Sequence, residues 1–189
     1  LVGSEMCIRD SDNIVDGDDR MTTGYSERPE YVFGFNGGFS YKGFNFSMQW
    51  SGATHVNKML QVEYRIPFTN AGKRGLLDYF YKQGWTEENQ LGAKYPRAAE
   101  TSETWNSENS TLWLKDASYI RLKTLTIGYT FTNKRFLKAI GAKSLGLSLN
   151  GYNLLTFSPL DILDPESLGN NVGAYPLVKV YSVGVNLNF

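Results

Sequence analysis

The sequence holds one cysteine, Cys7, and one histidine, His55, in 189 residues. A single cysteine excludes an internal disulfide framework and leaves no thiol nucleophile after residue 7. We interpret His55 as a loop residue rather than a ligand, because a protein metal site needs three or four donors. No stretch of about 18 apolar residues exists, which excludes a transmembrane helix. A membrane β-barrel stays open, because its strands give a much weaker hydropathy signal.

An excess of charge of either sign is also missing, since 19 Lys and Arg balance 19 Asp and Glu. No bulk charge therefore favours a nucleic-acid partner. A phosphate-binding glycine loop, a Ser-His-Asp set and a Cys/His cluster are absent, so the sequence predicts no catalytic residue, metal or cofactor, and no enzyme. What is abundant is Tyr (12), Phe (11) and Gly (19), which favours β structure with frequent turns.

The first eleven residues, LVGSEMCIRDS, show no usable periodicity and no signal-peptide core. We interpret residues 1–11 as a non-native lead and assign residues 12–189 to the protein proper.

A period of two dominates the rest of the chain. In VYSVGVNLNF at the C-terminus, large apolar residues alternate with Ser, Gly and Asn. Such a strand has one apolar and one small or polar face. The apolar face either covers a core or faces lipid. Similar alternation predicts antiparallel strands near 31–41, 43–53, 117–131, 144–154 and 178–189.

The connections between these strands alternate in length. They are about three, sixty, twelve and twenty residues, as expected for a barrel with short periplasmic turns and long extracellular loops. With the short connections on the periplasmic side, Phe189 lies at the periplasmic rim. A soluble sandwich gives no reason for this sorting of connections.

The alternation slips upstream of Thr124, where Arg121 and Lys123 occupy the parity that later becomes apolar. We expect either a bulge near Lys123 or a strand that leaves the bilayer there and packs against loops.

Two acidic segments raise the question of metal or catalytic sites. DNIVDGDDR, residues 12–20, fails the calcium-loop template because Ile14 occupies a ligand position, so a turn is favoured. Asp161, Asp164 and Glu166 could serve acid and base roles, but no third group supports them. Asp164-Pro165 is better interpreted as a turn signal.

The long connection from about 54 to 115 is rich in aromatic residues. Tyr81, Trp85 and Trp105 are the candidates for contact with a substrate or partner, because exposed rings stack on sugars and proteins. The favoured alternative is that the rings pack within the loop or form an interfacial belt, which suits Trp113. GLLDYFYKQ, residues 75–83, fits a short amphipathic helix.

Several of these segments carry a family resemblance. DASYIRLKTLTIGYTF and the final YPLVKVYSVGVNLNF, with PEYVFGFNGGFSYKGFNFSMQW, WTEENQLGAKYPR and LNGYNLLTFSPLDILDPES, resemble the closing strands of SusC/RagA-type TonB-dependent outer-membrane transporters. The likeness covers most of residues 12–189. It implies an all-β fold, namely antiparallel strands from the C-terminal part of a transmembrane barrel.

The resemblance also implies function and partners. Such transporters import oligosaccharides or peptides across the outer membrane of Gram-negative bacteria, use energy from TonB, and pair with a SusD-like surface lipoprotein. The terminal aromatic Phe189 matches the signal that the barrel-assembly machinery reads. The plug and the TonB contact would belong to a missing N-terminal region, because five strands are too few to close a barrel.

The sequence also allows two other interpretations. One is a soluble or surface-attached β-sandwich that binds carbohydrate through loop aromatics, and the other is a barrel without TonB coupling. A sandwich buries its apolar strand faces between two sheets, so side-chain exposure separates the first of these from a barrel wall. The residues to compare are Phe46, Trp50, Ile127, Tyr129, Val183 and Val185.

Overall fold

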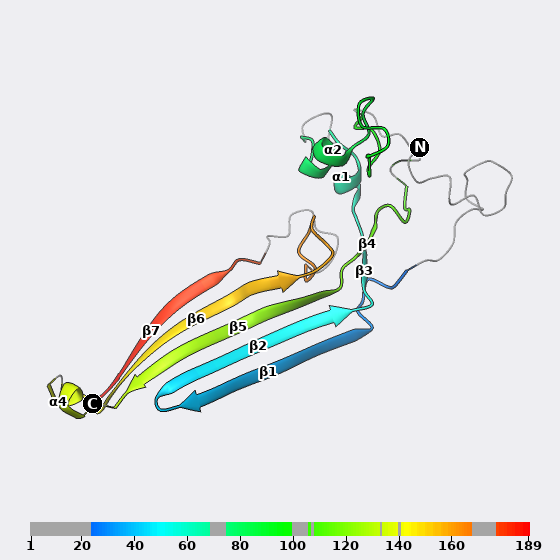
Figure 1. Cartoon of the computed structure of the whole chain (residues 1–189). Helices are drawn as coiled ribbons and strands as arrows, with labels where there is room; N and C mark the ends of the chain where they lie inside the picture. The colour runs from blue at the N-terminus through cyan, green and yellow to red at the C-terminus, as the bar shows by residue number, and fades with distance from the viewer. Residues whose placement is uncertain are drawn as a thin grey trace. The chain divides into compact units, whose positions relative to one another are not determined.

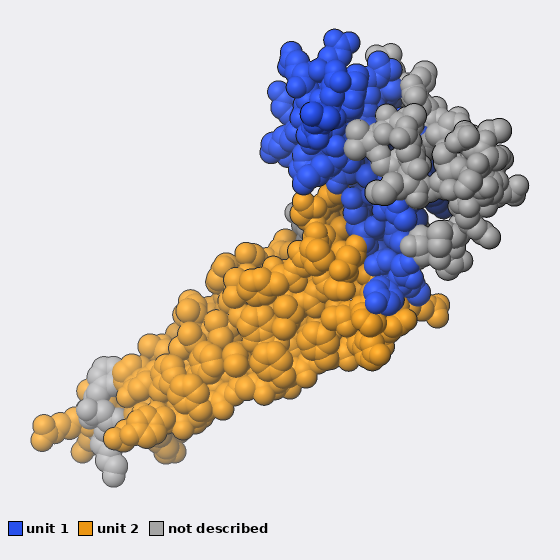
Figure 2. Space-filling model, turned by 45° about the vertical axis from the view of Figure 1, so that its right-hand side comes forward, with its two compact units in different colours: residues 1–27, 57–115, 168–173 blue, residues 28–56, 116–167, 174–189 orange. Residues whose placement is uncertain are grey.

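The computed structural model describes residues 24–68, 75–99, 106, 108–132, 134–139, 141–167 and 177–189. The chain divides into two compact units (Figure 2). The sheet unit consists of residues 28–56, 116–167 and 174–189, and the loop unit consists of residues 1–27, 57–115 and 168–173. The early acidic segment 12–20 and the lead 1–11 lie outside the described residues.

The sheet unit is built on one antiparallel five-stranded sheet with the order β1-β2-β5-β6-β7 (Figure 1). Its strands are β1 (Tyr31–Tyr41), β2 (Phe44–Thr54), β5 (Tyr119–Phe131), β6 (Ser144–Phe157) and β7 (Val180–Asn188). The all-β antiparallel fold is therefore confirmed. The strand predicted to end near 154 continues to Phe157.

The turn between β1 and β2 contains two residues with positive φ, Lys42 at 46° and Gly43 at 87°. A two-residue turn of this kind matches the right-handed twist of a hairpin. The longer connection between β5 and β6 contains α4 (Lys134–Ala139). Both connections are short enough to join neighbouring antiparallel strands directly.

The strand register gathers the apolar residues on one face of the sheet and the small or polar residues on the other. One transverse row of partners is apolar throughout: Phe39, Phe46, Ile127, Leu149 and Val183. The adjacent row is small or polar throughout: Gly38, Ser47, Thr126, Asn150 and Ser182. A one-residue slip would mix the two faces, so the alternation in sequence fixes the register.

The apolar face of the sheet is not covered by a second sheet in the described ranges, where the other sheet is the two-stranded pair of β3 (Asn57–Met59) and β4 (Leu114–Asp116). Val183 is 76% exposed, and Ile127 and Val185 are also exposed. Phe46 and Trp50 are half-buried because they stack on rings of β1, with Phe35 and Trp50 centroids 5.9 Å apart. A β-sandwich would bury this apolar face against a second sheet, so the exposed face does not fit that fold.

The expected bulge is confirmed at Lys123. Both ladders of β5 pass from Leu122 to Thr124 without pairing Lys123. The partner strand β6 is irregular at the same level, where Asn153 has φ of 53°. The bulge moves Leu122 onto the apolar face and places Arg121 on the polar face, paired with Ser51 and Thr156.

The loop unit contains β3 (Asn57–Met59), β4 (Leu114–Asp116), α1 (Val62–Arg65) and α2 (Asp78–Gln83). The short helix expected within 75–83 is thus present as α2, with Phe80 buried on its inner side. Trp113 and Leu60 are the largest fully buried side chains among the described residues. None of the described helices has the length and apolar character needed to span a membrane.

Candidate functional site

The polar face of the sheet carries a cluster of charged side chains centred on Arg121. Arg121 is only 2% exposed, although most residues of its strand β5 are half-buried or exposed. The bulge at Lys123 positions it, because without that extra residue Arg121 would share the apolar parity of the strand. We call Arg121, Lys123, Asp164 and Glu166 the Arg121 cluster.

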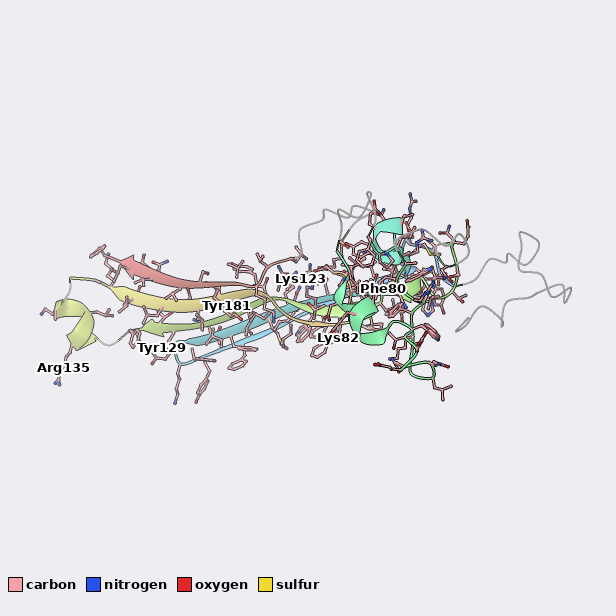
Figure 3. The ribbon with its side chains drawn as sticks, turned by 90° about the horizontal axis from the view of Figure 1, so that it is seen from above. Phe80, Lys82, Lys123, Tyr129, Arg135 and Tyr181 are labelled. Atoms are coloured by element: carbon pink, nitrogen blue, oxygen red, sulfur yellow. The ribbon has the colours of Figure 1, made fainter. Side chains whose placement is uncertain are left out.

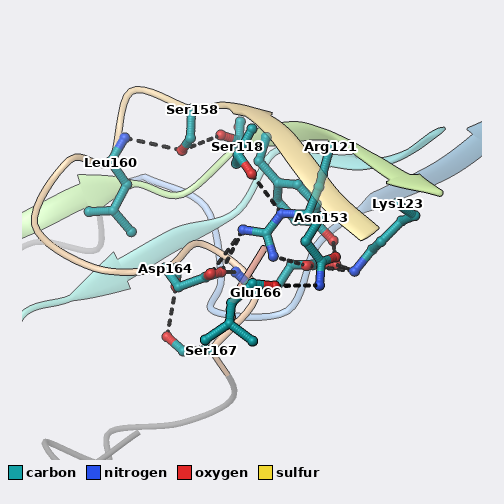
Figure 4. A network of polar contacts seen from close by, with 12 residues as sticks. Ser118, Arg121, Lys123, Asn153, Ser158, Leu160, Asp164, Glu166 and Ser167 are labelled. Carbon is teal, nitrogen blue, oxygen red and sulfur yellow. Dashed lines mark hydrogen bonds and ion pairs between the residues drawn. The ribbon is translucent and has the colours of Figure 1, made fainter. Parts of the chain in front are cut away.

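The guanidinium of Arg121 is held by three acceptor groups (Figure 4). Its Nη2 lies 2.9 Å from both carboxylate oxygens of Asp164, and its Nη1 lies 2.5 Å from Oε2 of Glu166. Its Nε donates to Oγ1 of Thr156 at 2.8 Å. A buried charge requires such pairing, because an isolated one would be strongly destabilising.

Glu166 receives two further donors. Nζ of Lys123 lies 2.6 Å from Oε1 and 2.7 Å from Oε2, and the Tyr119 hydroxyl donates to Oε1 at 2.9 Å. The cluster therefore contains two cations and two carboxylates. Both carboxylates are held by ion pairs and further hydrogen bonds, which favours a role in fixing the segment over the acid–base role considered for Asp164 and Glu166.

The segment 158–167 that carries these carboxylates is folded by its own contacts. The Asp164 carboxylate accepts the Glu166 N–H at 2.9 Å, and the Ser167 hydroxyl donates to the Asp164 carbonyl at 2.7 Å. These bonds turn the chain around Pro165, as the Asp-Pro pair predicted. The Ser158 hydroxyl donates to the Ser118 carbonyl at 2.8 Å, which ties the start of the segment to β5.

A small apolar cluster lies beneath the same segment. Leu160 packs with Val56 and Ala117, all of them buried, and Leu163 covers them. The Ala117 N–H donates to the Val56 carbonyl at 2.9 Å. Ion pairs and apolar packing together fix segment 158–167 against the ends of β2 and β5.

Segment 158–167, β6 and the residues before β7 also line an open pocket of about 250 Å³ on the polar side. Arg121, Asn153, Ser158 and Lys179 contribute polar or charged groups to its lining, and Leu160 and Leu163 contribute apolar ones. The mixed lining suits a small group that has both a polar and an apolar side.

The predicted contact residues are Tyr81, Trp85 and Trp105. The two that the structure describes differ in exposure. Tyr81 is 79% exposed on α2. Trp85 is half-buried, and its main-chain N–H donates to the Tyr95 carbonyl at 3.0 Å. Trp105 lies outside the described residues. Of the two candidates that the structure describes, Tyr81 has the more exposed ring, and its role in binding stays a prediction.

Four other rings of the long connection pack on one another. Phe80 and Tyr95 have centroids 5.8 Å apart, Tyr95 and Trp113 also 5.8 Å, and Tyr79 lies 4.8 Å from Tyr95. The Trp113 indole donates to the Asn106 carbonyl at 2.8 Å. These rings form the core of the loop unit, so the membrane-belt interpretation of Trp113 is wrong.

Burial has an electrostatic effect within this core. The Tyr79 hydroxyl donates to the Tyr64 carbonyl, and burial raises the pKa of Tyr79 well above its ordinary value because the phenolate would lose hydration. Nearby, burial lowers the pKa of Arg65, and Glu108 and Glu63 oppose the shift.

The remaining candidates, His55 and Phe189, make local contacts. His55 has its Nδ1 2.9 Å from Oε2 of Glu30 and its ring edge-on to Tyr31. Among the described residues, no three His, Cys, Asp or Glu side chains gather as a metal site would require. Phe189 is 75% exposed, and its main-chain oxygen accepts a hydrogen bond from Lys143 Nζ at 2.9 Å.

Sequence reasoning missed the Arg121 cluster. The available signals were the phase slip, which leaves two cations in a strand, and an acidic segment about forty residues later in sequence. Pattern alone did not connect them, because the pairing depends on the fold of segment 158–167.

Comparison with known proteins decides the family. No protein-family model matches the chain. A curated protein of Formosa agariphila, TonB-dependent receptor P26, is 31% identical over 201 residues, which cover 99% of this chain and 20% of that protein. The chain belongs to the SusC/RagA-type TonB-dependent receptors. TonB-dependent receptor P3 of the same organism is 27% identical over 85% of this chain and 16% of its own length.

Solved structures of the RagAB peptide importer place this receptor segment in the same fold. In the open-open state the TM-score is 0.67 at 25% identity, over 87% of this chain and 18% of that chain. In the closed-closed state the TM-score is 0.71 at 24% identity, over 93% and 19%. The segment therefore spans about a fifth or less of the length of the proteins it resembles.

Proposed function

We propose that this receptor segment forms part of the wall of an outer-membrane importer in a Gram-negative bacterium. The observation that carries the proposal is the sheet with an uncovered apolar face opposite a small and polar one. In a barrel wall the apolar face lies against lipid, and the polar face lines a watery interior. The family supports the same role, since its named relatives are receptors and importers.

The cargo and partners of the whole receptor form part of the same proposal. The cargo is a peptide or an oligosaccharide, and the RagAB importer structures favour the peptide. Import is energised through TonB, and a SusD-like surface lipoprotein covers the extracellular mouth. Tyr81 and Trp85, with Trp105, are the proposed contact residues of the long connection, and Phe189 is the proposed assembly signal.

The Arg121 cluster gives the polar face a fixed feature. With the short connections on the periplasmic side, segment 158–167 lies at the extracellular end of the strands, because it directly follows β6. Its ion pairs hold it on the side that would face the interior. We infer that it forms a rigid part of the mouth of the conduit.

Single-cysteine variants of the full-length receptor, made in a background without other cysteines and compared in matched pairs, test the wall assignment. The pairs are Val183→Cys with Ser182→Cys, and Ile127→Cys with Thr126→Cys. We expect a lipid-soluble quencher to reach labels at Val183 and Ile127, and a water-soluble maleimide to react at Ser182 and Thr126. Equal aqueous labelling within each pair contradicts the proposal.

Import itself requires a separate test. A strain that lacks the receptor gene should lose growth on peptide as sole nitrogen source or on oligosaccharide as sole carbon source. Restoration by the intact gene, but not by a gene without its TonB-contact region, would support energised import. Unchanged growth of the deletion strain on both classes of cargo would count against an importer.

A further inference from the structure

One end of the five-stranded sheet carries basic residues and no acidic residue. Residues 31–54, 117–160 and 177–189, which contain all five strands, include no Asp or Glu. We call residues 42–43 and 132–143 the short-connection end, because they join neighbouring strands. This end holds five cations and no acidic residue: Lys42, Lys134, Arg135, Lys138 and Lys143. All of the acidic residues in the sequence lie outside this end and outside the five strands of this sheet.

Strand pairing places the two short connections at one end of the sheet. The Thr130 N–H donates to the Gly43 carbonyl at 2.7 Å, which joins β5 to the first turn. The Lys143 N–H donates to the Asn188 carbonyl at 2.7 Å, which joins the second connection to the end of β7. The exposed cations Lys42, Arg135 and Lys138 therefore lie at one rim, where α4 and the end of β7 lie together in Figure 1.

Buried apolar side chains anchor the second connection. Leu137 of α4 is buried, as is Ala142 beyond it, and the Ala142 N–H closes the helix on the Leu137 carbonyl at 3.0 Å. Arg135 and Lys138 are exposed on the same short helix. Figure 3 shows Arg135 pointing away from the strands.

The same rim borders the uncovered apolar face. Lys42 Nζ lies 5.2 Å from the centre of the exposed Tyr41 ring, and Lys143 Nζ bonds the main chain of Phe189, whose ring is also exposed. A cation beside apolar surface matches the structure of a phospholipid, in which a phosphate lies directly above the acyl chains. A soluble polyanion would not use the apolar half of this surface.

We propose that the short-connection end binds anionic phospholipid headgroups of the leaflet that surrounds it. The apolar rim contacts the acyl chains, and the exposed side chains of Lys42, Arg135 and Lys138 contact the phosphates. Near an anionic surface each basic side chain contributes about 1 kcal/mol, or roughly fivefold in affinity, before screening by salt. The inference rests on the proposed membrane-wall role and adds a preference for lipid charge.

The full-length receptor in nanodiscs that contain both phosphatidylglycerol and phosphatidylcholine provides the test. Native mass spectrometry measures the ratio of the two lipids that stay bound. We expect the wild type to retain phosphatidylglycerol in preference, and the triple variant Lys42→Gln, Arg135→Gln, Lys138→Gln to lose that preference several-fold. Lys143 is left intact because its hydrogen bond to Phe189 could affect assembly.

A matched control removes the same charges elsewhere, with Lys82→Gln, Lys94→Gln and Arg97→Gln in the loop unit. The control should retain the wild-type lipid ratio. Equal retention of both lipids by an inserted wild-type receptor overturns the inference while leaving the wall assignment intact. A triple variant that keeps the wild-type lipid ratio overturns the inference as well. That holds even if the triple variant no longer co-sediments with peptidoglycan sacculi, which would indicate peptidoglycan rather than lipid as the partner of these cations. A receptor that fails to insert would instead contradict the membrane-wall role.

Discussion

The sheet unit and the loop unit use apolar side chains in opposite ways. In the sheet, Val183 is 76% exposed and its apolar row runs uncovered across five strands. In the loop unit, Trp113 is 1% exposed at the centre of a packed set of rings. The loop unit thus follows the rule for water, where apolar groups gather inside. The sheet follows the rule for hydrocarbon, where apolar side chains point outwards and the backbone groups of neighbouring strands hydrogen-bond to one another.

The Arg121 cluster forms an exception within the sheet, and removing its centre should have the largest effect. Arg121→Met leaves Asp164 without its cation partner and removes one of the donors of Glu166. Breaking one side of a buried ion pair costs about 3–5 kcal/mol. Urea unfolding of the full-length receptor from lipid vesicles should show this loss, and protease should cut segment 158–167 faster.

Two matched variants separate charge from geometry at this position. Arg121→Lys keeps the charge but cannot bridge both carboxylates, so it should recover only part of the lost stability. Combining Arg121→Met with Asp164→Asn removes the carboxylate that has lost its cation and keeps the Lys123–Glu166 ion pair, so this double variant should be less destabilised than Arg121→Met alone. Equal stability of Arg121→Met and wild type would show that the cluster does not hold the segment.

The packed rings of the loop unit give a second strong effect. Trp113→Ala removes the largest fully buried side chain among the described residues and its hydrogen bond to Asn106, at an expected cost of about 3–5 kcal/mol. Hydrogen exchange should accelerate in the loop unit, while insertion of the sheet into the membrane is unchanged. Tyr81→Ala, at an exposed ring on α2, should change stability by less than about 0.5 kcal/mol. Loss of membrane insertion in Trp113→Ala would contradict the separation of the two units.

The exposed apolar face should be sensitive to charge on one parity only. Val183→Arg places a cation where lipid is expected, at a cost of about 2–4 kcal/mol near the middle of the bilayer. Ser182→Arg, one residue earlier and on the polar face, should be tolerated far better. The fraction of full-length receptor assembled in outer membranes measures both. Normal assembly of Val183→Arg would remove the main support for a lipid-facing wall.

The sequence was enough to predict the sheet, because strict alternation determines both strand position and register. It also predicted the bulge at Lys123, since a phase slip in one strand must be absorbed by an extra residue. The placement of Trp113 was wrong because a ring next to a strand start can serve either a membrane belt or a loop core. Propensity does not distinguish these two environments, and the packing partners Phe80 and Tyr95 lie far away in sequence.

The Arg121 cluster could not be derived for a related reason. Its two halves are about forty residues apart, and nothing in their spacing indicates a contact. The Asp-Pro turn was predictable from local chemistry, but the direction in which the turn presents Asp164 and Glu166 depends on packing of Leu160 and Leu163. Local rules therefore gave the turn and the strand, and only the tertiary fold gave the ion pairs.

The smallest effect tests whether the polar face tolerates added volume evenly. Gly38 lies where a Cβ would be 2.7 Å from the Phe46 carbonyl oxygen, so Gly38→Ala should force the β1–β2 ladder apart at a cost of about 1–3 kcal/mol. At Gly146 the nearest atom to a Cβ is Asn186 Cβ, 3.6 Å away. Gly146→Ala should therefore be neutral, or stabilising by about 0.5–1 kcal/mol through reduced backbone entropy. Urea unfolding midpoints of the two variants give the comparison, and equal midpoints would show that the close β1–β2 approach at Gly38 relaxes without cost.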